Sequence, residues 1–301
     1  MTSLISINQS NVVANSNNST YTYNFQGTAL FNNHEIAVAS ISMYYSWVNI
    51  SAALQNNVFS YTWTVGVTTT TYTITIPDGL YELSDLNNLL QFNMIKNGTY
   101  LINATSQNVY YAEFLVSPTL YKFQINTFPI PTSLPSGYTA PLANVAAGYA
   151  AFPGYPTTTQ NSVVTIPANF STIMGFTGAF ATSANVGVGT NLTYNSTTTP
   201  QIQPSPNALV GCSLVSNKYS TPSTLIYSVV PTVGLAQLIV SNPNEYSWVE
   251  VNKGNYNSIT IQFLSSATYQ PLQLLDNNLT ILLLIREKQS KQELNQSKLL
   301  R

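Results

Sequence analysis

The sequence predicts an all-β fold of the sandwich or barrel type. Three observations support this: many short segments alternate apolar with polar residues, these segments are rich in β-branched and aromatic residues, and the chain shows only one well-marked helical pattern. Short strands at this spacing are typical of antiparallel sandwiches and barrels, not of alternating βαβ units. The expected strands cover residues 21–25, 36–45, 58–65, 72–76, 109–116, 121–128, 209–215, 225–230, 247–251, 259–264 and 279–285.

The single clear helix is expected over residues 84–97. Ser84 is a plausible N-cap, and Asp85 suits the first turn of a helix. Lys96 lies near the C-terminal end, and Asn97-Gly98 supplies a left-handed stop. One face carries apolar residues at helical spacing, which indicates packing against a sheet. These residues are Leu86, Leu89, Leu90 and Met94.

Residues 128–206 differ in character from the flanking strands. Pro, Gly, Thr and Asn dominate, and no charged residue occurs between Lys122 and Lys218. We expect a long loop-rich insertion or small subdomain between sandwich strands. Because a loop of this length in a compact protein is usually functional, we expect it to contact a partner or a host surface.

The last 16 residues, 286–301, form a basic tail. They hold five of the nine Lys and Arg residues of the chain and only two acids. One interpretation is a solvated tail. The other is an arm that docks on a neighbouring subunit or on packaged nucleic acid, to which we expect at most a weak contact.

Charged residues make up only 6% of the chain, against about 25% in an ordinary soluble protein. The formal net charge is -1, so no strong field directs the protein toward nucleic acid. Such a small net charge provides little repulsion between copies. This composition is typical of a structural or recognition protein and poorly suited to an enzyme.

The residues that carry most catalysis and metal binding are scarce. One cysteine, Cys212, and one histidine, His34, exclude a disulfide framework and a multi-thiolate zinc site. Cys212 lies in a strand-like run and is expected to be buried. We therefore expect no catalytic residues, no cofactor and no metal. Two carboxylates acting together could hydrolyse a glycosidic bond. A local role in a turn or a helix explains each candidate better, and the candidates are Asp78, Glu82, Asp85, Glu245 and Glu250.

Aromatic residues cluster where one expected strand ends. Tyr44, Tyr45 and Trp47 follow one another there, and Tyr61 and Trp63 alternate in the next strand. Such residues pack in cores first of all, but tyrosines left exposed among Ser, Asn and Gly form contact surfaces. The candidate interface residues are Tyr44, Tyr45, Trp47, Arg286, Lys288, Lys291, Lys298 and Arg301.

Several segments, taken in order, resemble the penton (minor capsid) proteins of virophages, polinton-like viruses and related large DNA viruses. The resemblance covers residues about 40–285 and rests on a series of short segments. They are residues 42–51, 55–61, 76–81, 85–90 with Asn97-Gly98, 167–176, 211–215, 222–224, 259–263 and 271–276.

The resemblance implies a jelly-roll β-sandwich that forms homopentamers at icosahedral vertices. Its partners would be other copies of itself, the major capsid protein, and further minor capsid or spike proteins. The implied location is the capsid vertex of the virion, after synthesis in the host cytoplasm. No membrane-spanning segment is expected. The jelly roll would comprise residues 1–127 and 207–285, with the insertion at 128–206 and the tail at 286–301.

Three other roles are compatible with the sequence. A viral fibre or adhesin with a β-sandwich head would use the Tyr-, Asn- and Thr-rich insertion to bind a host receptor or glycan. A β-sandwich glycan hydrolase would need one of the carboxylate pairs named above. A minor cement protein between capsomers could share the fold with a vertex protein.

Overall fold

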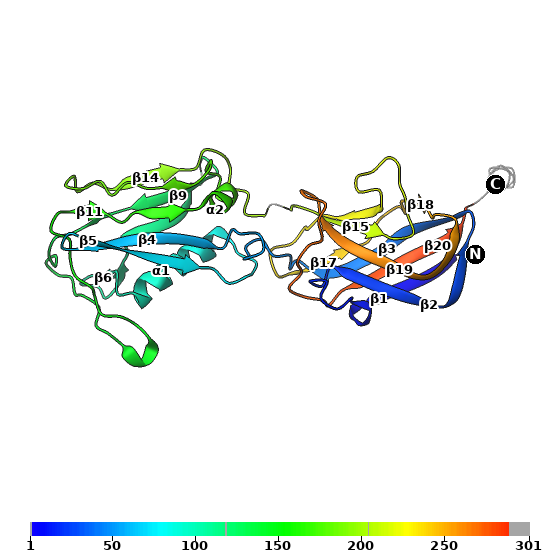
Figure 1. The fold of residues 1–301 in the computed structure, drawn as a ribbon, viewed down its shortest axis with the longest axis horizontal. Coiled ribbons are helices and arrows are strands. Elements are labelled where there is room, and N and C mark those ends of the chain that lie inside the picture. Colours follow the sequence, from blue (N-terminus) through cyan, green and yellow to red (C-terminus); the bar gives the residue numbers. More distant parts are fainter. Residues whose placement is uncertain (1, 118, 204, 289–301) are drawn as a thin grey trace. The chain divides into compact units, whose positions relative to one another are not determined.

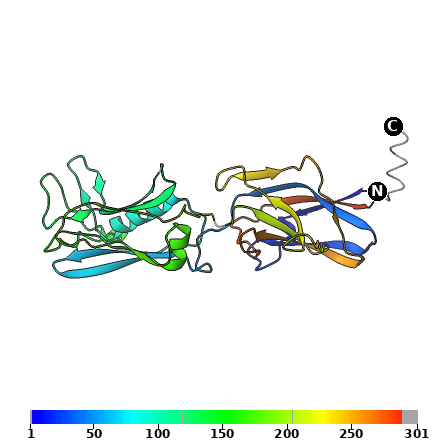
Figure 2. The same cartoon turned by 90° about the horizontal axis from the view of Figure 1, so that it is seen from above.

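The computed structural model describes residues 2–117, 119–203 and 205–288. The chain forms two compact units, unit 1 from Met1–Val48 with Ser205–Arg301 and unit 2 from Asn49–Pro204. Antiparallel strands dominate both units (Figures 1 and 2). The predicted all-β class is therefore confirmed.

Unit 1 is built from two antiparallel sheets. The first sheet has the strand order β1-β20-β3-β17, and short β18 also pairs with β3. The second sheet has the order β16-β15-β19-β2. The strands are β1 (Thr2–Asn8), β2 (Thr20–Phe31), β3 (His34–Tyr44), β15 (Ala208–Cys212), β16 (Leu225–Val229), β17 (Leu238–Ser241), β18 (Val249–Glu250), β19 (Gly254–Ser265) and β20 (Thr280–Glu287), with a 3-10 turn η1 (Gln9–Asn11) after β1.

The pairing of the eight main strands of unit 1 is that of a jelly roll. In chain order the first strand pairs with the last, the second with the seventh, the third with the sixth and the fourth with the fifth. These pairs are β1 with β20, β2 with β19, β3 with β17, and β15 with β16. The pattern is one long hairpin rolled into two sheets, which is the jelly-roll form of a sandwich. The predicted jelly roll is therefore confirmed in unit 1.

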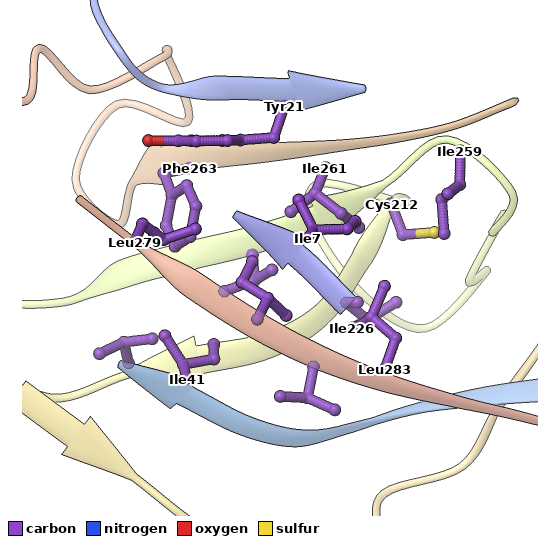
Figure 3. Close-up of a cluster of buried hydrophobic side chains, with 14 of the residues drawn as sticks. Ile7, Tyr21, Ile41, Cys212, Ile226, Ile259, Ile261, Phe263, Leu279 and Leu283 are labelled. Carbon is purple, nitrogen blue, oxygen red and sulfur yellow. The ribbon is translucent and has the colours of Figure 1, made fainter. Parts of the chain in front are cut away.

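The core of unit 1 lies between its two sheets. Ile7, Ile41 and Leu283 from the first sheet face Tyr21 and Phe263 from the second (Figure 3). Along β20 the buried residues Ile281, Leu283 and Ile285 alternate with partly exposed ones. Burial of this apolar surface is the main force that stabilises the sandwich.

Unit 2 is a second sandwich with a helix. One sheet has the order β13-β12-β4-β5 and another the order β14-β9-β8. Its elements are β4 (Val58–Val65), β5 (Thr68–Thr75), α1 (Leu83–Lys96), β6 (Leu101–Ile102), β7 (Asn108–Val109), β8 (Ala112–Ser117), β9 (Lys122–Thr127), β10 (Pro129–Ile130), η2 (Val145–Ala147), β11 (Gln160–Asn161), β12 (Val164–Ile166), α2 (Ala168–Ile173), β13 (Phe180–Ala181) and β14 (Leu192–Asn195). Its core contains five phenylalanines, and the rings of Phe59 and Phe114 lie 5.3 Å apart.

The predicted helix is present as α1 and packs against β8. Leu86, Leu90 and Met94 are fully buried, as the spacing predicts. The helix begins one residue before the predicted cap, however, because Glu82 holds the extended N-cap position in place of Ser84. Asp85 accepts a hydrogen bond of 2.8 Å from the backbone N–H of Glu82, which secures this first turn.

The division of the chain differs from the ranges expected from sequence. Residues 49–127, which were assigned to the jelly roll with 1–48, lie in unit 2, because β4, β5, β8, β9 and α1 share one core with residues of 128–204. The insertion is therefore longer than 128–206 and contains its own sheets. The chain leaves the jelly roll after β3 and re-enters it before β15.

Candidate interface of the jelly roll

The outer face of the first sheet of unit 1 carries no charged side chain along most of its length. Directly paired residues project to the same side of a sheet. Leu4 pairs with Leu284, Ser6 with Leu282, and Leu282 with Ser40. We call this surface the aliphatic face. Its residues are Leu4, Ser6, Ser40, Ser42, Tyr44, Leu238, Val240, Thr280, Leu282 and Leu284.

Large apolar side chains on the aliphatic face are exposed. Leu4 is 61% exposed, Val240 58% and Leu238 44%. Leu4 lies on edge strand β1 and the other two on edge strand β17, so they flank the sheet on both sides. Apolar surface of this kind, continuous with uncharged serines, marks an interaction site more often than an ordinary solvent face.

The outer face of the second sheet is also uncharged but is polar. Thr22 pairs with Thr260, and their hydroxyl oxygens lie 3.0 Å apart. Thr20 pairs with Gln262, and Asn24 with Ser258. We call this surface the hydroxyl–amide face. It can form hydrogen bonds with a neighbour, and no charge would lose its hydration there.

Six charged side chains of unit 1 gather at one end of the first sheet, and they are Glu35, Lys218, Glu250, Lys253, Arg286 and Lys288. Arg286 Nε lies 2.6 Å from Glu35 Oε1, and the guanidinium lies 3.8 Å from the centre of the Trp248 ring. Lys288 Nζ lies 3.2 Å from Glu250 Oε2. A groove of about 660 Å³ opens beside these pairs, and Lys218 and Lys253 also line it. Charge is therefore kept at an end and off the two sheet faces.

The eight candidate interface residues do not lie together in one surface. Tyr44 lies on the aliphatic face, partly exposed and opposite Leu238. Arg286 and Lys288 form the ion pairs at the charged end. The remaining basic candidates, Lys291, Lys298 and Arg301, lie outside the described residues.

Two of the aromatic candidates belong to the core of unit 1. Tyr45 is 8% exposed and Trp47 1%, and their rings lie 4.3 Å apart. The Trp47 indole N–H donates to the backbone oxygen of Ser205 at 3.0 Å. Their rings are therefore occupied inside the protomer, and the expectation that they offer surface to a neighbour is corrected.

Sequence reasoning did not single out Leu4, Leu238 or Val240. Residues 238–241 read Leu-Ile-Val-Ser, in which no alternation separates the buried Ile239 from its exposed neighbours. The register with β3 alone reveals which side chains point outward. No signal in the sequence by itself could have found this face.

Cys212, the one cysteine of the chain, lies in the core of unit 1. Burial raises the pKa of the Cys212 thiol to about 12, so the thiol stays protonated in the folded protein. Among the residues that the structure describes, no three His, Cys, Asp or Glu side chains gather in a group that could hold a metal ion. Within the same described ranges, no helix combines the length and the apolar character that crossing a membrane requires.

Unit 2 has a groove of its own, with a volume of about 590 Å³. Its lining is rich in tyrosine, amide and proline side chains. The Asn108 amide donates to the Tyr110 hydroxyl at 3.2 Å, which fixes one wall. The other lining residues include Asn103, Gln107, Tyr111, Glu113, Pro131, Pro135, Tyr138 and Asn191.

Comparison with known proteins finds similarity only at the level of structure. No protein family model matches the chain, and no curated protein matches its sequence. The mavirus penton protein is similar with a TM-score of 0.42 and 10% identity, over 95% of this chain and 98% of that one. A chain of the Sputnik virophage structure, determined by electron cryo-microscopy, has a TM-score of 0.40 and 9% identity over the same shares.

The first of these neighbours is a penton protein, and the second is a chain of a virophage particle. Their TM-scores lie below 0.5 and about one residue in ten is identical. The function proposed below therefore rests on the surfaces of this chain and on the resemblance of its sequence segments.

Proposed function

We propose that this chain is a structural capsid protein that forms homopentamers at icosahedral vertices and contacts the major capsid protein there. The observation that carries the proposal is the distribution of charge on the jelly roll. In the strands that the structure describes, both outer faces lack charged side chains apart from Glu35, Glu250 and Arg286 at one end of the first sheet.

A ring of identical subunits needs two different patches on each copy, because each subunit meets its two neighbours through different surfaces. The aliphatic face and the hydroxyl–amide face are two such patches. Burying either one removes no charge from water, so association avoids the largest desolvation penalty. Large obligate interfaces are depleted of charge in the same way.

The number five comes from the family resemblance, as do the vertex position and the major capsid protein as partner. Further minor capsid or spike proteins are candidate partners of unit 2. The basic tail is a candidate for weak nucleic-acid contact. With these partners, the protein would be a component of the virion.

The test is the native mass of the purified full-length chain. We expect a species of five times the chain's 32.9 kDa. Val240→Glu should reduce it to monomers, because a carboxylate would be buried against a neighbour without a partner. The matched control is Val230→Glu, since Val230 is 56% exposed but lies off the aliphatic face. A monomeric wild type, or a ring unchanged by Val240→Glu, would overturn this assignment of the interface.

A second candidate function is glycan binding by unit 2. The groove lined by Tyr110, Tyr111 and Tyr138 favours it, because tyrosine rings and amides suit the apolar faces and hydroxyls of sugars. Binding of the full-length chain to a glycan array, lost in Tyr138→Ala, would support it. No binding to any glycan would leave unit 2 without this role.

A further inference from the structure

The groove of unit 2 contains a buried hydroxyl that has no partner within the described part of the chain. We call this groove, of about 590 Å³, the tyrosine groove. Tyr111 lines it and is only 6% exposed. Among the residues that the structure describes, none forms a hydrogen bond with the Tyr111 hydroxyl. A molecule that fills the groove must supply that bond, because burial of a hydroxyl without a partner costs free energy.

The Tyr111 hydroxyl is held in one place and in one protonation state. Its ring packs edge-to-face on Trp63, with the ring centroids 5.4 Å apart. Burial raises the pKa of the hydroxyl, and the neighbouring hydroxyls of Tyr138 and Tyr155 raise it further. The group therefore stays protonated at neutral pH and can both donate and accept a hydrogen bond.

The walls of the tyrosine groove are formed in the free protein. The backbones of Ile102 and Thr139 exchange two hydrogen bonds of 2.9 and 2.8 Å, which attach the segment that carries Tyr138 to β6. The N–H of Phe128 donates to the carbonyl oxygen of Tyr111 at 3.0 Å. Because these segments are already paired, little ordering is needed when a ligand binds.

The charge of the tyrosine groove is negative. Among the described residues, no Lys, Arg or His lines it, and the one charged lining residue is Glu113. The Glu113 carboxylate accepts a bond of 2.9 Å from the Asn126 amide, and it forms no ion pair within the described ranges. Residues 49–204 contain two Lys and four acids, so their formal charge is 2 − 4 = −2. An anionic ligand would therefore lie beside a like charge with no cation to balance it.

We propose that the tyrosine groove selects uncharged saccharides over sialylated ones, with the Tyr111 hydroxyl as the buried contact to a sugar hydroxyl. The inference rests on the second function proposed above and adds the class of glycan and the residue that selects it. Tyr138, which is partly exposed, offers its ring to the apolar face of a sugar. A purely apolar ligand would leave Tyr111 unpaired, and an acidic one would meet Glu113, whereas a neutral sugar avoids both penalties.

The test is binding of the full-length chain to N-glycans presented in matched pairs, each with and without terminal sialic acid. We expect the neutral member to bind at least about tenfold more tightly, because the sialic acid carboxylate is repelled by Glu113. Glu113→Gln should narrow this ratio, since it removes the charge and keeps an acceptor for the Asn126 amide. The matched control is Glu245→Gln on unit 1, which should leave the ratio unchanged.

Tyr111→Phe tests the buried contact, because it removes only the hydroxyl and keeps the ring against Trp63. We expect affinity for the neutral glycan to fall about three- to tenfold. The midpoint of urea unfolding should stay at the wild-type value, since the hydroxyl has no partner within the described protein. The matched control is Tyr121→Phe, because Tyr121 is 73% exposed and lies outside the groove. It should leave the affinity unchanged.

The outcomes separate this inference from the functions on which it builds. Equal or tighter binding of the sialylated members, or wild-type affinity in Tyr111→Phe, would overturn the inference while glycan binding itself stands. Absence of binding to every glycan would overturn both the inference and the second function. The native mass of the same samples tests the capsid function separately.

Discussion

Asn49 is fully buried, and its side-chain amide joins three distant parts of the backbone of unit 2. The amide nitrogen donates to the carbonyl oxygens of Tyr81 at 2.7 Å and Ile202 at 2.9 Å. The amide oxygen accepts from the N–H of Tyr81 at 2.9 Å. One side chain thereby connects the first residues, an early turn and the last residues of the unit.

Replacement of Asn49 by alanine should strongly destabilise unit 2. Three partly buried backbone groups lose their partners. Because a fully buried unsatisfied group costs about 1–3 kcal/mol and these groups are only partly buried, we expect the free energy of unfolding to fall by about 1–3 kcal/mol in total, as measured by urea unfolding. Asn24→Ala, on the exposed hydroxyl–amide face, is the control and should change it by under about 0.5 kcal/mol. Equal effects of the two variants would contradict this role for Asn49.

Cys212 makes stability depend on pH in a defined direction. Burial raises its pKa from 9.0 to about 12. Above pH 9 the unfolded chain loses the thiol proton while the folded chain keeps it, so the free energy of unfolding falls as pH rises from about 9 toward 12. Cys212→Ala should show a shallower fall over that range in pH-dependent urea titrations. Identical slopes for the two proteins would show that the thiol plays no part.

The identities of the aromatic candidates do not show which of them are buried and which lie on the surface. Tyr44, Tyr45 and Trp47 have similar neighbours in sequence, yet only Tyr44 lies on the outer face. The buried pair is fixed by contacts over long sequence distances, such as the bond from Trp47 to Ser205. Local pattern carries no information about such a contact.

At the scale of elements, helix α1 shows what a local sequence pattern can predict. Its apolar spacing and its C-terminal Asn97-Gly98 were enough to place the helix within about one residue. The helix starts at Leu83, one residue earlier than predicted. The reason is that the Asp85 carboxylate, inside the first turn, accepts a hydrogen bond from the backbone N–H of Glu82. In contrast, the two-residue and three-residue strands of unit 2 are too short for their alternation to be recognised, and α2 contains few strong helix formers.

Leu90→Ala should destabilise unit 2 by about 2–5 kcal/mol, because Leu90 is fully buried between α1 and the sheets and its loss leaves a cavity. Phe92→Ala is the control on the same helix, since Phe92 is 49% exposed. It should cost less than about 1 kcal/mol. Urea unfolding followed by the circular dichroism of each variant makes the comparison. A larger effect at Phe92 would mean that α1 packs through its other side.

At the scale of the whole molecule, the jelly roll is interrupted once, between β3 and β15. The sequence indicated an insertion but placed its start at residue 128, because strands β4, β5, β8 and β9 read like any other sandwich strand. The pattern of a strand predicts that it joins a sheet, but it does not predict which of several sheets the strand joins. Assignment of strands to one core requires long-range pairing, which the sequence of a single chain does not display.

Deletion of unit 2 should leave an intact jelly roll. The two points where the chain leaves and returns are close, since the Trp47 side chain bonds the Ser205 backbone. We expect a chain in which a short Gly-Ser linker replaces residues 49–204 to fold with a cooperative transition and a native near-ultraviolet signal from Trp47. A molten or unfolded product would show that the jelly roll needs unit 2. The reciprocal fragment 49–204 should also fold, because it has its own core.

The central claim is that uncharged sheet faces exist on this jelly roll to pack against copies of itself in a closed ring. The most direct test is a reconstruction, by electron cryo-microscopy, of particles that contain this chain. The account predicts five copies around each icosahedral vertex, with the aliphatic face of one copy covered by its neighbour. A different copy number around its axis, or an aliphatic face left open to solvent in the particle, would contradict it.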